Sequence, residues 1–143
     1  MPRHLLIVDN DDQLRRSLTL TFQMEKFSVL PAKTGNEALG LLTAYRLDGI
    51  VIDALVTELS LDDMPGFNLI KKIHAIDCTI PIIVMSGQST KQMLIDLLRM
   101  GCCDFLEKPV EREVIVKSIH AAIASHERKI NSKFTPQVAA HAA

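Results

Sequence analysis

The sequence has almost no net charge and no long apolar run. Its 16 Lys and Arg residues oppose 17 Asp and Glu residues, so the formal net charge is −1. Dedicated nucleic-acid-binding domains carry a basic surface, so we expect no direct contact with nucleic acid. The apolar runs are far shorter than a membrane-spanning helix requires, and the short run at 5–8 is too brief for a secretory signal. We therefore expect no membrane association.

Cysteine is also scarce, with only Cys78, Cys102 and Cys103. An odd number of cysteines argues against a disulfide framework and favours a reducing compartment, so the expected location is the cytoplasm. Their spacing with the five histidines matches no zinc site, and we expect Cys102 and Cys103 to fill the core. The apolar fraction of 48% is ordinary for a globular protein, and 143 residues suit a single domain.

Short apolar runs alternate with longer amphipathic stretches along the chain. Strands are predicted at 5–8, 28–30, 49–52, 81–85 and 103–106, and helices at 12–25, 36–46, 66–75, 90–100 and 111–129. Such alternation predicts an α/β fold, with one open parallel sheet covered by helices on both faces. We expect one domain over 1–126, followed by the end of the last helix and a loose tail or linker over 127–143.

Polar residues follow the predicted strands. Asp9 comes after the first strand, Asp53 after the third, Ser86 after the fourth and Lys108 after the fifth. The carboxyl ends of parallel strands meet at one edge of a sheet, and ligands bind there. These four side chains are therefore expected to share one site.

The segments 6–11, 50–53, 81–87 and 101–109 resemble those of the receiver domain of a two-component response regulator. The resemblance extends over about 3–126. It implies a flavodoxin-like, doubly wound five-stranded sheet of order 2-1-3-4-5. It also implies that Asp53 accepts a phosphoryl group from a sensor histidine kinase or a phosphotransfer protein. Lys108 and Ser86 would then contact the phosphoryl oxygens.

The resemblance also implies a metal site. Attack of one anion on another needs cations that cancel the repulsion, and Mg²⁺ (or Mn²⁺) held by carboxylates serves this purpose. The expected ligands are Asp9, Asn10, Asp53 and the backbone carbonyl of Leu55, with Asp11 as a further candidate. Asn10 stands where the family usually has a second acid, which predicts weaker Mg²⁺ binding. A harmless local substitution is the alternative.

The family resemblance further implies a conformational switch. Ser86 would move toward the phosphoryl group, and Phe105 would turn inward. The surface formed by the fourth helix, fifth strand and fifth helix would then engage a downstream effector protein or a second copy of the chain. The fourth predicted helix is more apolar than one core-facing stripe requires, which favours such an interface. A cis Lys108–Pro109 bond is expected by analogy.

A second departure from the family follows Asp53. The predicted third strand ends at Asp53, so the segment 54–65 contains an insertion of about five residues beside the site. One hypothesis is a lid over the site, with Glu58, Asp62 or Asp63 lending charge to the metal. The other is a solvated surface insertion.

Three functions remain open at this point. The leading interpretation is a phosphorylatable signalling receiver, which is no enzyme beyond phosphotransfer and slow self-dephosphorylation. The second is an atypical receiver that is not phosphorylated and acts as a protein-interaction module. The third is a phosphatase of the haloacid dehalogenase type with Asp9 as nucleophile. The sequence names no cognate kinase, stimulus, output target, phosphoryl lifetime or oligomeric state, and the chain is either a stand-alone protein or a fragment.

Overall fold

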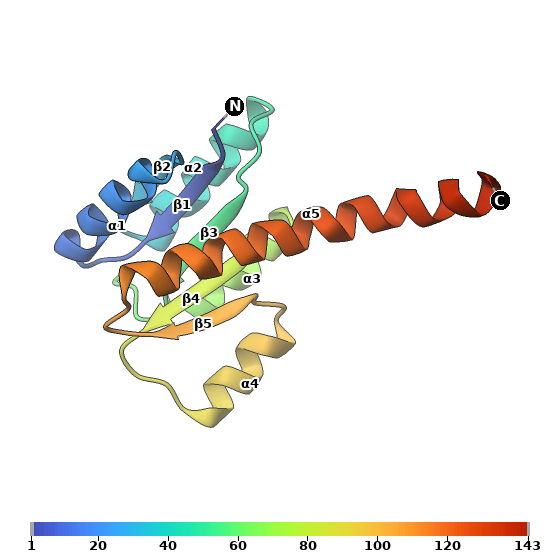
Figure 1. Cartoon of the computed structure of the whole chain (residues 1–143). Helices are drawn as coiled ribbons and strands as arrows, with labels where there is room; N and C mark the ends of the chain where they lie inside the picture. The colour runs from blue at the N-terminus through green and yellow to red at the C-terminus, as the bar shows by residue number, and fades with distance from the viewer. Residues whose placement is uncertain (1, 143) are drawn as a thin grey trace.

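The computed structural model describes the backbone of residues 2–142 and the side chains of residues 2–131. Five strands alternate with five helices over these residues. Figure 1 shows how they are arranged. The elements are β1 (His4–Val8), α1 (Asp12–Met24), β2 (Ser28–Ala32), α2 (Gly35–Leu47), β3 (Ala54–Glu58), α3 (Gly66–Ile76), β4 (Ile82–Ser86), α4 (Lys91–Arg99), β5 (Asp104–Glu107) and α5 (Arg112–Ala142).

Side-chain caps fix where several helices begin. The Asp11 carboxylate accepts hydrogen bonds from the amides of Gln13 and Leu14 at the start of α1. Thr34 caps α2, and Thr90 caps α4, each through its hydroxyl. These caps satisfy amides that a helix leaves without an internal partner. They also hold α1 and α4 in place directly after the loops that follow β1 and β4.

The sheet is parallel throughout and has the strand order β2-β1-β3-β4-β5. Alternate residues of each central strand point to opposite faces. Leu6 and Val8 pack with the helices α2, α3 and α4, whereas Leu5 and Ile7 pack with α1 and α5. Figure 1 shows α1 and α5 together on one face of the sheet. The predicted fold and strand order are confirmed.

The predicted position of the third strand was wrong. It was expected at 49–52, but β3 begins at Ala54 and ends at Glu58. Every residue of β3 is buried, so both of its faces are covered and no polar alternation marks its ends. Residues 49–53 instead lead into the strand, beginning at Gly49, whose φ is +73°. The connection to α3 is short, so the expected insertion over 54–65 is absent.

The last helix is longer than predicted. Its expected end was near residue 129, and α5 continues to Ala142, so that its C-terminal part extends beyond the sheet (Figure 1). The division into a domain over 1–126 and a tail stays a prediction. Cys102 is buried as expected, but Cys103 is exposed. Within residues 2–142, none of the helices combines the length and the hydropathy that crossing a bilayer requires.

Candidate functional site

Four polar residues lie at the carboxyl edge of the sheet. Asp9 follows β1, Glu58 ends β3, Ser86 ends β4 and Lys108 follows β5. The register pairs Val8 with Thr57, which places Asp9 beside Glu58. Asp9 is fully buried, and Glu58 and Ser86 are buried as well. The edge predicted to hold the site therefore gathers these residues, with Glu58 in place of Asp53 at the end of the third strand.

Lys108 joins the two acids. Its ammonium Nζ lies 2.8 Å from Oδ2 of Asp9 and 3.5 Å from Oε1 of Glu58. The other oxygens of both carboxylates accept backbone amides, from Asp11 to Asp9 at 2.9 Å and from Leu59 to Glu58 at 3.0 Å. One cation thus neutralises part of two buried negative charges, leaving a formal charge of −1.

The burial of Glu58 changes its acidity. Burial raises the pKa of Glu58 above its ordinary value, and the charge of Lys108 and the Leu59 amide oppose this rise only in part. The nearby Asp9 carboxylate acts in the same direction as burial. Desolvation disfavours the charged form of an acid, and a second acid close by does the same. Lys108 and the Leu59 amide therefore favour the charged form of Glu58, against the effects of burial and of Asp9.

The loops around this site are tied to each other. The Asn10 side-chain amide donates to Oδ1 of Asp62 at 3.1 Å, which joins the loop after β1 to the loop after β3. The Asp63 carboxylate accepts the amides of Gly35 and Asn36 at the start of α2, both at 2.9 Å. The segment after β3, for which a lid and a solvated insertion were the two hypotheses, is therefore a short connection held to its neighbours.

Gly66 lets α3 begin directly against the end of β3. Its amide donates to the carbonyl of Leu59 at 2.7 Å. A Cβ atom at this position would lie 2.6 Å from the carbonyl oxygen of Glu58, and also 2.6 Å from Cα of Leu59. Only glycine permits so close an approach of the helix to the strand.

Asp53 lies at the opposite edge of the sheet. Its carboxylate accepts the amide of His4 at 2.8 Å, and its own amide donates to the carbonyl of His4 at 2.9 Å. Five residues of strand separate it from Glu58, a distance of about 16 Å. The expectation that Asp53 meets Asp9, Ser86 and Lys108 was wrong, because the third strand begins after Asp53.

Leu55 is also away from the site. It lies within β3, fully buried, with Leu6 and Ile82 as its neighbours on the adjacent strands. Its carbonyl therefore belongs to the interior of the sheet. The expectation that Leu55 is a metal ligand was wrong for the same reason as the expectation for Asp53. Both assumed that the third strand ends at Asp53, whereas β3 ends at Glu58, five positions later.

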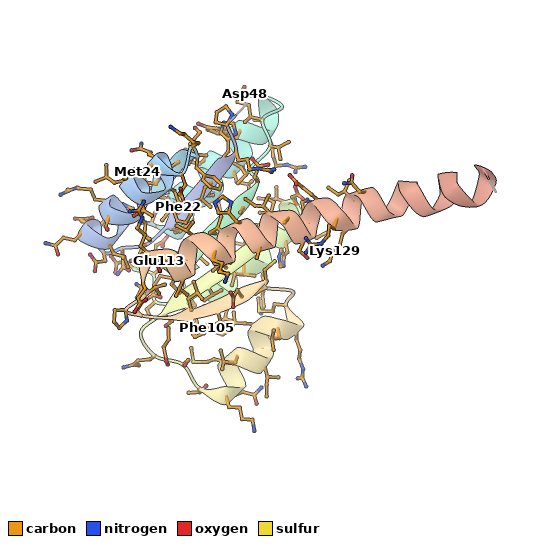
Figure 2. All side chains as sticks on the ribbon, viewed as in Figure 1. Phe22, Met24, Asp48, Phe105, Glu113 and Lys129 are labelled. Atoms are coloured by element: carbon orange, nitrogen blue, oxygen red, sulfur yellow. The ribbon has the colours of Figure 1, made fainter. Side chains whose placement is uncertain are left out.

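The remaining predicted residues lie where the strands were expected to place them. The Ser86 hydroxyl donates to the carbonyl of Gln88 at 3.1 Å. Phe105, labelled in Figure 2, is half-buried on β5 and packs against the core on the side of α4. The Lys108–Pro109 bond is cis, as expected. The roles assigned to Ser86 and Phe105 in a switch stay predictions.

The donors at this edge do not fit a divalent ion in this arrangement. Magnesium prefers several oxygen ligands that are free to face it. Here each carboxylate oxygen of Asp9 and Glu58 already faces an amide or the Lys108 ammonium. Asn10 contacts Asp62, and the Asp11 carboxylate caps α1. Over the part of the chain whose side chains are described, no group of three or more His, Cys, Asp or Glu residues is arranged to hold a metal.

One signal in the sequence pointed to Glu58. The turn that precedes α3 is marked by Pro65 and Gly66, and βα connections are usually short. Counting back from this turn by an ordinary loop length ends the third strand near Glu58. Placing the end at Asp53 required an unusually long loop, which itself argued against that assignment.

Known proteins match this chain over most of its length. The family model described as "Response regulator receiver domain" matches residues 5–120. The transcriptional regulatory protein GlrR of Escherichia coli (strain K12) is 29% identical over 122 residues, which are 85% of this chain and 26% of GlrR. The transcriptional regulatory protein FixJ of Rhizobium meliloti (strain 1021) is 32% identical over 116 residues, which are 81% of this chain and 54% of FixJ.

A solved structure shares the fold. The CheY-like receiver domain protein from Methanospirillum hungatei JF-1 superposes with a TM-score of 0.81 at 22% identity, covering 90% of this chain and 99% of the other. At that identity the likeness concerns the fold alone. The chain spans only about a quarter of GlrR and about half of FixJ, so the activities of those whole proteins do not transfer directly.

Proposed function

This chain belongs to the response regulator receiver family of two-component signalling, and from that premise we propose that it acts as a protein-interaction module without forming an aspartyl phosphate. The observation that carries the proposal is Glu58 at the end of β3, with its carboxylate facing Lys108. By the family resemblance, the end of the third strand is the position of the aspartate that accepts the phosphoryl group.

The additional methylene of glutamate explains how Glu58 occupies the site. It carries the carboxylate about 1.5 Å further from the strand than an aspartate would. The acid therefore reaches the Lys108 ammonium, which the resemblance assigns to a phosphoryl oxygen. The Glu58 carboxyl stands opposite Lys108 without phosphotransfer, so the site holds one arrangement of these two groups.

Asn10 supports the same conclusion. A phosphorylated receiver needs cations that offset the charge of the incoming phosphoryl group. Asn10 brings no negative charge to attract a divalent ion, and its amide contacts Asp62. The residues retained from the expected machinery, Asp9 and Lys108, pair with each other. The module is therefore proposed to work without Mg²⁺.

The partners proposed for this module are signalling proteins. Receiver domains act between kinases and effectors, and this chain would contact such proteins in one fixed state. No observation favours the phosphatase alternative, and the chain matches the receiver family over residues 5–120. The proposed interface around α4, β5 and α5, for an effector or a second copy, rests on the exposed Leu98 of α4.

The test uses beryllofluoride, which mimics a phosphoryl group on a carboxylate. Backbone amide spectra of the wild type are recorded with and without beryllofluoride and Mg²⁺. We expect no saturable shift at the amides near Glu58. The variant Asn10→Asp/Glu58→Asp restores a shorter acceptor and an additional acid, and it should respond. A saturable wild-type response that disappears in Glu58→Gln would contradict the proposal.

A further inference from the structure

A groove between α3 and α4 lies outside the site described above. It has a volume of about 430 Å³ and is lined by five residues: Phe67, Lys71, Asp96, Arg99 and Met100. Its walls are one turn of each helix, because Phe67 and Lys71 are four residues apart, as are Asp96 and Met100. The groove is therefore about 6 Å long along each helix.

The floor of the groove is apolar. Phe67 and Met100 are half-buried and pack against the core cluster beneath α3 and α4. Among the α4 side chains, all of which the structure describes, Leu97 alone is buried. Methionine adapts its shape to different partners, and an aromatic ring beside it gives a large apolar contact.

The rim of the groove carries cations without acidic partners. Neither Lys71 nor Arg99 forms a salt bridge among the residues with described side chains, and both are exposed. Asp96, the one acid of the rim, instead accepts a hydrogen bond from Gln92 at 2.9 Å. Several other arginines and lysines of the chain have carboxylate partners. The rim is thus complementary to an acidic partner.

We infer that this groove docks an acidic amphipathic segment of a partner protein. The segment would place an apolar side chain, or two such side chains one helical turn apart, on Phe67 and Met100. Carboxylates flanking it would face Lys71 and Arg99. The apolar floor would supply most of the affinity, and the two cations would select acidic over basic segments. The inference rests on the proposed function, because both take binding to a partner protein as the output of this domain.

The probe is a displayed library of random peptides, selected on the full chain without phosphodonor or Mg²⁺. We expect enrichment of peptides that combine Leu, Phe, Ile or Met with Asp or Glu. A selected peptide should bind Lys71→Glu/Arg99→Glu about tenfold more weakly than the wild type in fluorescence anisotropy. The control Arg16→Glu/Lys26→Glu changes the net charge equally on the exposed surface around α1, outside the proposed interface, and should bind like the wild type.

Three outcomes would overturn the inference. These are enrichment of basic peptides, equal loss of binding in the groove variant and the α1 control, and self-association of the chain that only the groove variant abolishes. The last outcome would identify a second copy as the occupant. The peptide experiment involves no phosphoryl chemistry, so its failure would contradict this inference alone. A response of Glu58 to beryllofluoride would contradict the proposed function alone.

Discussion

Replacing Lys108 by methionine should destabilise the fold strongly, because Lys108 is the cation shared by two buried acids. Its Nζ lies 2.8 Å from Asp9 and 3.5 Å from Glu58. At an effective dielectric constant of about 20, these distances correspond to attractions of about 6 and 5 kcal/mol. Desolvation of the three groups offsets much of this. Removing one partner of a buried pair lowers the free energy of unfolding by about 3–5 kcal/mol.

Urea denaturation followed by circular dichroism measures this effect. A loss of about 4 kcal/mol lowers the denaturation midpoint by about 2 M for a domain of this size. Lys117→Met, on the exposed surface of α5, is the matched control and should change the free energy of unfolding by less than about 0.5 kcal/mol. Adding Glu58→Gln to Lys108→Met should recover part of the loss, since it removes one uncompensated charge. Equal midpoints for Lys108→Met and Lys117→Met would refute the shared-cation account.

Three further predictions concern other parts of the domain. Asp53→Ala should lower the free energy of unfolding, measured by urea denaturation, by about 1–2 kcal/mol, because the His4 amide loses its acceptor. An unchanged denaturation midpoint would contradict this role of Asp53. Gly66→Ala should lower the free energy of unfolding by about 1–3 kcal/mol, since the added Cβ meets the Glu58 carbonyl, and a stabilised variant would show that the helix moves freely. Burial raises the pKa of Asp77, but Thr79 and Arg46 outweigh it, so the folded pKa lies below the ordinary 3.8. The stabilisation from Asp77 is therefore present above that value and lost as the pH falls through the folded pKa, and Asp77→Asn should flatten the acid limb of stability against pH. An unchanged acid limb would contradict this assignment.

The overall fold could be predicted because its signals are spread along the chain. Five apolar runs alternating with five amphipathic stretches define a parallel α/β sheet even where individual boundaries are displaced. Asp9, Ser86 and Lys108 were placed correctly because the strands before them end clearly in the sequence. In the structure Lys108 indeed pairs with Asp9, although the two lie far apart in the chain.

The end of the third strand could not be found from apolar pattern alone. Residues on both sides of Asp53 are apolar, and a strand buried on both faces shows no alternation that fixes its register. Asp53 therefore marked a plausible strand end, while Glu58 was assigned to a loop. The pairing of Lys108 with both acids could not be predicted from the sequence either, because it depends on how the ends of three separate strands are placed in space.

The central claim is that Glu58 occupies the acceptor position and that the domain forms no aspartyl phosphate. Intact mass after incubation with a small phosphodonor and Mg²⁺ tests it most directly, using wild type, Asp53→Asn and Glu58→Gln beside a receiver domain known to accept the same donor. We expect a phosphoryl adduct on that control receiver and none on any form of this chain. An adduct on the wild type that is lost with chelator and absent from Asp53→Asn or from Glu58→Gln would contradict the account and identify the residue that carries the phosphoryl group.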